Sequence, residues 1–147
     1  MNDRVVFRTV CLGLAAFAAG AGPSAASVDT SPKPGGVFRL KPGFYVQKGV
    51  DCGSTPNAAI RRYDGRGISG AHTRECRARV VSRRGSRVTV DQSCIDSGAG
   101  VAPRTIERQV IDVADALTFT VRRPGHATTF RYCPTYLLPA DLRGGAK

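Results

Sequence analysis

Short runs of β-branched and aromatic residues recur along the chain, separated by clusters of glycine, proline, asparagine and aspartate. From about residue 37 onward these runs return at intervals of roughly 8 to 12 residues, a spacing typical of antiparallel sandwiches and barrels. No amphipathic helix interrupts the pattern. The sequence therefore predicts an all-β domain, a small antiparallel barrel or sandwich of about 7–8 strands.

The segment 74–95 alternates regularly enough to predict a hairpin and its register. A three-residue loop is expected at 84–86, because hairpins of this length use glycine for a left-handed position. The predicted pairs on one face are Ala78 with Gln92, Val80 with Val90, Ser82 with Val88, and Cys76 with Cys94. The other face would hold Arg77, Arg79, Val81, Arg83, Arg87, Thr89 and Asp91. A shift by one residue would mix the two faces and separate the cysteines.

A second hairpin is predicted to turn at Pro124 and Gly125, which suit the central positions of a type II turn. A loop at 114–116 would join it to the preceding strand, 106–113, in a three-stranded meander. The predicted pairs are Phe119 with Phe130, Leu117 with Tyr132 and Val121 with Thr128, and, upstream, Val113 with Leu117 and Ile111 with Phe119. Earlier strands are expected over 37–40, 44–46 and 59–63 and near Ile68.

The first 27 residues have the three-part layout of a secretory signal peptide. A basic head precedes an apolar stretch from Val10 to Ala21, and small residues follow it up to Ser27. The apolar stretch is shorter than the roughly 20 residues that span a bilayer. We therefore predict a removed leader over 1–27, no transmembrane segment, and a secreted protein whose expected location is the periplasm.

The rest of the chain is predicted to form one domain. Residues 28–36 have the composition of a flexible linker. The range 37–138 is long enough for a single β domain with a modest core, and 139–147 is expected to be a mobile tail.

Four cysteines remain after the leader: Cys52, Cys76, Cys94 and Cys133. An even number in an exported chain predicts disulfides. The hairpin register pairs Cys76 with Cys94, which leaves Cys52 for Cys133 by elimination. The spacing does not fit a zinc site, because no Cys-x-x-Cys occurs and neither histidine has a neighbouring ligand. We expect neither a metal nor a cofactor.

The chain is strongly basic, with a formal charge of +11 that falls to +10 if the leader takes Asp3, Arg4 and Arg8 with it. Arginine supplies 18 of the 22 basic residues, and guanidinium groups bind carboxylates and phosphates through paired hydrogen bonds. The arginines predicted to share one face of the first hairpin are a candidate anion-binding surface: Arg77, Arg79, Arg83 and Arg87. Alternatively, this face is simply the solvated side of a half-buried sheet.

Glycines are dense between residues 63 and 70, beside an aromatic residue and an arginine. Tyr63, Asp64 and Arg66 could form a recognition loop that enters a partner's cleft. The alternative is a tight hairpin whose glycines supply positive backbone angles.

Residues suited to catalysis are few. His126 lies in a predicted turn, and His72 in a glycine-containing stretch without a positioned partner. No pair of carboxylates stands out, and no glycine loop is followed by the lysine of a phosphate-binding loop. The sequence therefore predicts no enzyme, although a small hydrolase with His72 and Asp64 at its site is one alternative.

The function that these features favour is an exported, non-enzymatic binding protein. Its arginine-rich face would bind an anionic envelope component or an acidic protein. An inhibitor of a secreted hydrolase, acting through the glycine-rich loop or through residues 28–36, is the alternative. Nucleic acid is not expected as a partner, because the basic face lacks interleaved aromatic residues.

Overall fold

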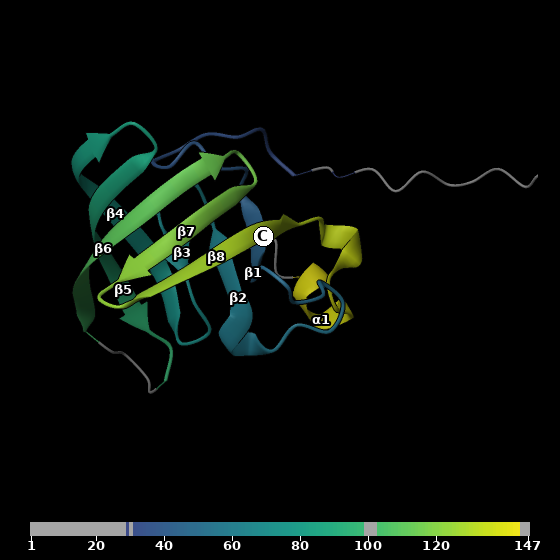
Figure 1. The fold of residues 1–147 in the computed structure, drawn as a ribbon. Coiled ribbons are helices and arrows are strands. Elements are labelled where there is room, and N and C mark those ends of the chain that lie inside the picture. The colour runs from purple at the N-terminus through teal and green to yellow at the C-terminus, as the bar shows by residue number, and fades with distance from the viewer. Residues whose placement is uncertain (1–28, 30, 99–102, 145–147) are drawn as a thin grey trace, which may run out of the picture.

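The computed structural model describes residues 29, 31–98 and 103–144 (Figure 1). Eight strands form one sheet, and three short helical segments accompany them. The strands are β1 (Gly43–Gln47), β2 (Ile60–Tyr63), β3 (Ile68–Ser69), β4 (Thr73–Arg84), β5 (Arg87–Asp96), β6 (Arg104–Asp115), β7 (Thr118–Arg123) and β8 (His126–Cys133). The helical segments are η1 (Asn57–Ala59), η2 (Thr135–Leu137) and α1 (Ala140–Arg143).

The sheet curls into a nearly closed antiparallel barrel. Its strand order is β3-β2-β1-β8-β7-β6-β5-β4, so β3 and β4 are the two edges. Between these edges the described residues show one backbone bond outside the ladders: the Ala78 amide of β4 donates to the carbonyl of Arg66, just before β3 (2.8 Å). The all-β prediction is confirmed, and of its two architectures the barrel is the one formed.

Both predicted disulfides are present. Cys76 and Cys94 join the neighbouring strands β4 and β5, with their Cα atoms 4.1 Å apart. Cys52 and Cys133 join the loop after β1 to the end of β8, with a Cα separation of 5.9 Å. The second bridge therefore ties the first strand to the last, as the elimination argument expected.

The predicted register of the first hairpin is confirmed in its middle and wrong near its turn. Ala78 lies opposite Gln92, and Val80 opposite Val90, but Arg83 lies opposite Val88 in the place predicted for Ser82. The cause is a bulge between Val80 and Ser82, which leaves a two-residue turn at Gly85 and Ser86. A second irregularity, between Arg74 and Arg77, includes Cys76 of the disulfide. Bulges add local twist and bend, which lets these long strands follow the curve of the barrel.

The second predicted hairpin is confirmed: Phe119 lies opposite Phe130, and Val121 opposite Thr128. Gly125 has the positive φ of 69° that its turn requires.

The predicted loop between β6 and β7 is wrong by two residues, because Val113 lies opposite Phe119 instead of Leu117. The Asp115 carboxylate accepts a bond from the Leu117 amide (2.7 Å) and forms a tighter turn than expected. An irregularity between Val113 and Asp115 takes up the extra residue.

The amino-terminal segment is part of the domain. Residues 37–40, predicted as a strand, form a turn with a single bridge between Gly35 and Leu40. Arg39 has a φ of 58° there, which is incompatible with a strand. Within the predicted linker, Asp29 pairs with Lys41 at 2.5 Å and accepts a bond from the Tyr132 hydroxyl. The predicted leader, 1–27, lies outside the described residues.

The carboxyl-terminal segment also contacts the barrel. Leu138 is fully buried, and Leu142 of α1 packs beside it in the part of the chain predicted as a tail. Both belong to a small cluster outside the barrel, with Phe44, Val46 and the Cys52–Cys133 bridge. Among the described residues, no helix has the length and apolar character needed to cross a membrane.

The main core fills one end of the barrel. Its largest members are Phe38, Tyr45, Tyr63, Phe119 and Phe130, all buried. Phe38 comes from the amino-terminal segment, which crosses the top of the barrel in Figure 1. The segment predicted as linker and strand therefore closes this end.

Candidate functional site

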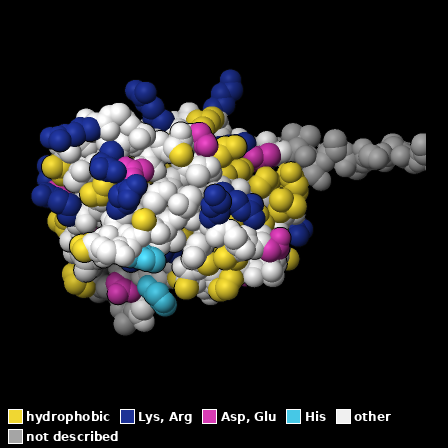
Figure 2. Space-filling view, viewed as in Figure 1, with side chains coloured by type: hydrophobic (Ala, Val, Ile, Leu, Met, Phe, Trp, Pro, Cys, Tyr) yellow, Lys and Arg dark blue, Asp and Glu magenta, His cyan; other side chains and the backbone are white. Residues whose placement is uncertain are grey.

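Outward-facing arginines gather on the side of the barrel built by β4–β7. They alternate with the inward, buried residues of the same sheet, such as Val88 and Val90 on β5. Six of them, here called the arginine face, are Arg77, Arg79, Arg84, Arg87, Arg108 and Arg122. Arg104 also faces outward on β6 but pairs with Glu75, away from the two aspartates of this face. Figure 2 shows basic side chains, in dark blue, gathered over this side with acidic side chains between them.

Two aspartates divide most of the arginine face into ion-pair groups. Asp91 accepts bonds from Arg79 (2.5 Å) and Arg108 (2.8 Å). Asp112 accepts bonds from Arg87 (2.8 Å) and from Arg122. The bond from Arg108 is the main cause that lowers the pKa of Asp91, and the bond from Arg87 does the same for Asp112. Both aspartates are therefore charged at neutral pH and hold the guanidinium groups in place.

The arginine face keeps an excess of positive charge. Its six arginines and two aspartates carry a formal charge of +4. Arg77 and Arg84 are exposed, and neither has an ion-pair or side-chain hydrogen-bond partner among the described residues. The side chains of the four arginines in ion pairs are also exposed, from 49% for Arg122 to 76% for Arg79.

Three of the four arginines predicted for this surface lie on it, and the fourth does not. Because of the bulge in β4, Arg83 shares the inward side with Val88 and donates to the Val37 carbonyl (2.8 Å). The sequence reasoning missed Arg108 and Arg122. The alternation of β6 in register with β5 could have indicated Arg108, which lies opposite Asp91.

The predicted recognition loop is held by hydrogen bonds, and one of its three residues belongs to the core. Tyr63 is buried, and its hydroxyl bonds to the Phe38 amide (3.1 Å) and the Gly35 carbonyl (2.8 Å). Burial raises the pKa of this phenol. Asp64 accepts bonds from the Arg66 amide (2.9 Å) and pairs with the exposed Arg66 guanidinium (3.2 Å). Asp64 and Arg66 thus remain at the surface, while Tyr63 anchors the loop.

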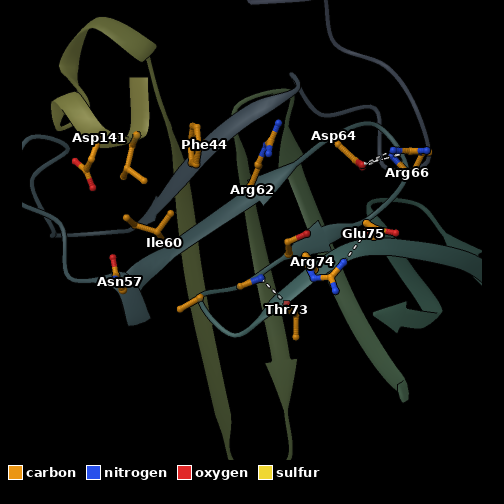
Figure 3. Close-up of a pocket in the computed structure, with 14 residues that line it drawn as sticks. Phe44, Asn57, Ile60, Arg62, Asp64, Arg66, Thr73, Arg74, Glu75 and Asp141 are labelled. Carbon is orange, nitrogen blue, oxygen red and sulfur yellow. Dashed lines mark hydrogen bonds and ion pairs between the residues drawn. The ribbon is translucent and has the colours of Figure 1, made fainter. Parts of the chain in front are cut away.

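Asp64 and Arg66 form one end of a groove of about 720 Å³ on the outside of β1–β3 (Figure 3). Apolar side chains of β1 and β2, Phe44 and Ile60, line it, and Asp141 of α1 lies at its other end. Its charged groups largely pair with one another, as Arg74 does with Glu75 at 2.7 Å. The groove therefore offers an apolar surface with a rim of ion pairs.

Both histidines line a second cavity of about 380 Å³ at the other end of the barrel from the Phe38 segment. Figure 2 shows them in cyan at the lower edge of the molecule. The His126 ring bonds to the Thr128 hydroxyl (2.7 Å). Asp64, the hypothetical catalytic partner of His72, lines the outer groove instead. Among the described residues no three histidine, cysteine, aspartate or glutamate side chains cluster as metal ligands would.

A buried glutamine that the sequence reasoning left without a role closes the barrel beside this cavity. Gln92 accepts a bond from the Ile68 amide (2.9 Å) and donates to the Ile68 carbonyl (3.0 Å). It also donates to Gln109 (3.1 Å), which donates in turn to Glu107 (2.8 Å). The Gln92 carboxamide thus makes the two hydrogen bonds to Ile68 that a neighbouring strand would otherwise make at the edge of β3.

Comparison of the chain with protein-family models, curated proteins and solved structures gave no match.

Proposed function

We propose that this protein is a non-enzymatic binding protein that attaches to anionic surfaces of the cell envelope through its arginine face. The observation that carries the proposal is the uncompensated charge of +4 on one exposed side of the sheet. Guanidinium groups suit this role because their planar fork matches both phosphate and carboxylate oxygens.

The arrangement of the arginines favours a repetitive partner. Neighbouring strands lie about 4.8 Å apart, and alternate residues along a strand about 6.6 Å apart. Arg77 and Arg79 follow each other on β4, and Arg108 lies two strands away beyond Asp91. Cations spread in rows over a sheet suit an array of head groups better than one small ligand. Acidic proteins are the alternative partner.

Export to an oxidising compartment is part of the proposal. The predicted leader over 1–27 and the disulfides Cys52–Cys133 and Cys76–Cys94 support it, because disulfides persist outside the reducing cytosol. In a secreted or periplasmic protein, the arginine face would meet anionic lipids and polymers directly.

The test is co-sedimentation with phosphatidylglycerol vesicles, with phosphatidylcholine vesicles as the uncharged comparison. The variant R77S/R84S removes the two cations that have no partner and leaves both ion-pair groups intact. Each basic residue near an anionic membrane contributes about 1 kcal/mol, so we expect binding to weaken roughly 30-fold. Binding of the unchanged protein should also fall as salt rises.

The matched control is K33S/K48S, which removes the same charge from exposed positions outside the arginine face. This control should keep most of the affinity. Equal losses in the two variants would show that net charge alone drives binding. Absence of binding to phosphatidylglycerol at low salt would overturn the proposal in favour of an acidic protein partner.

A further inference from the structure

The interior of the barrel changes character along its axis. On the strands β5–β8, inward positions near the Phe38 end are apolar, and those toward the other end are polar or charged. The inward series are Val88, Val90 and Gln92 on β5; Ile111, Gln109 and Glu107 on β6; Phe119, Val121 and Arg123 on β7; and Phe130, Thr128 and His126 on β8. The polar halves surround the cavity of about 380 Å³, here called the open end.

Arg61 brings a cation without a counter-ion to the open end. It points inward from β2, opposite Tyr45, and its guanidinium lies over the Phe130 ring, 4.8 Å from the centroid. One of its nitrogens donates to the carbonyls of Ala58 (3.0 Å) and Ile60 (2.7 Å). Among the described residues, no carboxylate lies within ion-pair distance of Arg61.

Burial, and then the charge of Arg123, lowers the pKa of the Arg61 guanidinium. Arginine nevertheless keeps its proton in proteins, so the positive charge stays inside the barrel. This charge is partly removed from water and has no carboxylate beside it among the described residues, which costs free energy. A bound anion would offset that cost.

The remaining charges at the open end nearly cancel. Arg123 lies 3.7 Å from Glu107, and both side chains are more than half exposed. The two arginines and one glutamate that line it, Arg61, Arg123 and Glu107, sum to one positive formal charge. A single monoanion therefore neutralises the cavity, whereas a dianion would exceed its charge.

We propose that the open end binds a small organic carboxylate, with its charged group at Arg61 and Arg123 and its apolar part against Val121 and Phe130. The cavity has the volume of a small-molecule site, for which about 300–1,000 Å³ is usual. Its walls are more polar than is usual for such sites, which suits a charged ligand with a small apolar part. The open end lies inside the barrel and the arginine face outside it, so this inference is independent of the proposed envelope binding.

The test is a titration of the ¹⁵N-labelled chain, with both disulfides formed, by benzoate and by its neutral analogue benzamide. The side-chain amide signals of Gln92 and Gln109 report on the cavity by NMR. We expect benzoate to shift them saturably and benzamide to bind at least tenfold more weakly. Absence of benzoate shifts at these amides, or equal binding of benzamide, would overturn the proposal.

Substitutions locate the site. Arg61→Met should weaken benzoate binding at least tenfold, whereas the matched control Arg77→Met, which removes an outer arginine, should not change it. If Arg61→Met fails to fold, Arg123→Met serves in its place, because that side chain is at the exposed rim. Glu107→Gln removes the one carboxylate among the described residues that line the cavity and should strengthen binding several-fold. Equal effects of the Arg77 substitution and the cavity arginine substitutions would overturn the proposal.

Discussion

At the scale of the residue, Gln92 shows how one side chain can complete a barrel. Its neighbour on β4, Ala78, is small, so the carboxamide reaches the backbone of Ile68 at the edge of β3. The glutamine is 4% exposed, and both of its polar atoms have partners. A buried amide that satisfies two backbone groups stabilises the fold because those groups would otherwise be left unpaired.

We expect Gln92→Leu to lower the free energy of unfolding by about 2–4 kcal/mol, because the Ile68 amide and carbonyl lose their partner. Urea denaturation measures the change. Gln109→Leu is the control, since Gln109 is only partly buried and contacts no backbone group at the seam; we expect it to cost less than about 1 kcal/mol. Equal losses of unfolding free energy in the two variants would show that the hydrogen bonds of Gln92 to Ile68 do not account for its contribution to stability.

Because of the aspartates of the arginine face, we expect the free energy of unfolding to decrease at acidic pH. The folded pKa values of Asp91 and Asp112 lie below the ordinary value of 3.8 because of their arginine partners. Their ion pairs therefore stabilise the fold fully above about pH 3.8, and this contribution disappears as pH falls through the lower, folded values. The difference in unfolding free energy between the unchanged protein and D91N/D112N should shrink over the same range, as urea titrations from pH 7 to pH 3 would show.

Although D91N/D112N should be less stable than the unchanged protein at neutral pH, we expect it to bind anionic vesicles more tightly. Loss of two negative charges makes the arginine face more positive, so D91N/D112N should bind phosphatidylglycerol vesicles several-fold more tightly. Weaker binding would indicate that the aspartates matter chiefly by orienting the arginines.

At the scale of the element, alternation predicted most strands and the centre of both hairpins. It placed Val80 opposite Val90 and Phe119 opposite Phe130 because a regular ladder has a strict period of two. It failed at the bulges, which displaced Arg83 to the inward side. The positions of bulges depend on the curvature of the whole barrel, and that curvature cannot be inferred from a local pattern of polar and apolar residues.

The two disulfides should differ in their contribution. Cys52–Cys133 spans 81 residues and Cys76–Cys94 spans 18. In the chain-entropy model, these loops correspond to about 4.5 and about 3 kcal/mol. We therefore expect C52A/C133A to destabilise the protein more than C76A/C94A in urea denaturation. The reverse order would show that packing around Cys76 outweighs the length of the loop.

At the scale of the whole molecule, the amino-terminal segment acts as a lid on the closed end of the barrel. Phe38 lies outside all eight strands, yet it is 1% exposed. We expect Phe38→Ala to cost about 3–5 kcal/mol, as for other buried aromatic side chains. Leu137→Ala, at a residue that is 47% exposed, should change stability by less than about 0.5 kcal/mol. Thermal or urea unfolding of the two variants measures the contrast.

The open end could not be predicted from the sequence, whereas part of the arginine face could. Arg77, Arg79 and Arg87 belong to one hairpin, so a single register brings them together. Glu107 and Arg123 lie on the paired strands β6 and β7, but Arg61 comes from β2 and meets them only when the sheet curls. His126 likewise reads as an ordinary turn residue until the barrel places it beside His72.

The seam between β3 and β4 gives the barrel the mechanics of a split ring. Seven ladders hold the other neighbours together, while in the described residues this seam has one backbone bond, from Ala78 to Arg66, and the bonds of the Gln92 side chain to Ile68. Such a ring can change its circumference by opening at the split, while the strand ladders elsewhere stay intact. Ile68 belongs both to the seam and to the wall of the open end, so a wider seam would mean a wider cavity.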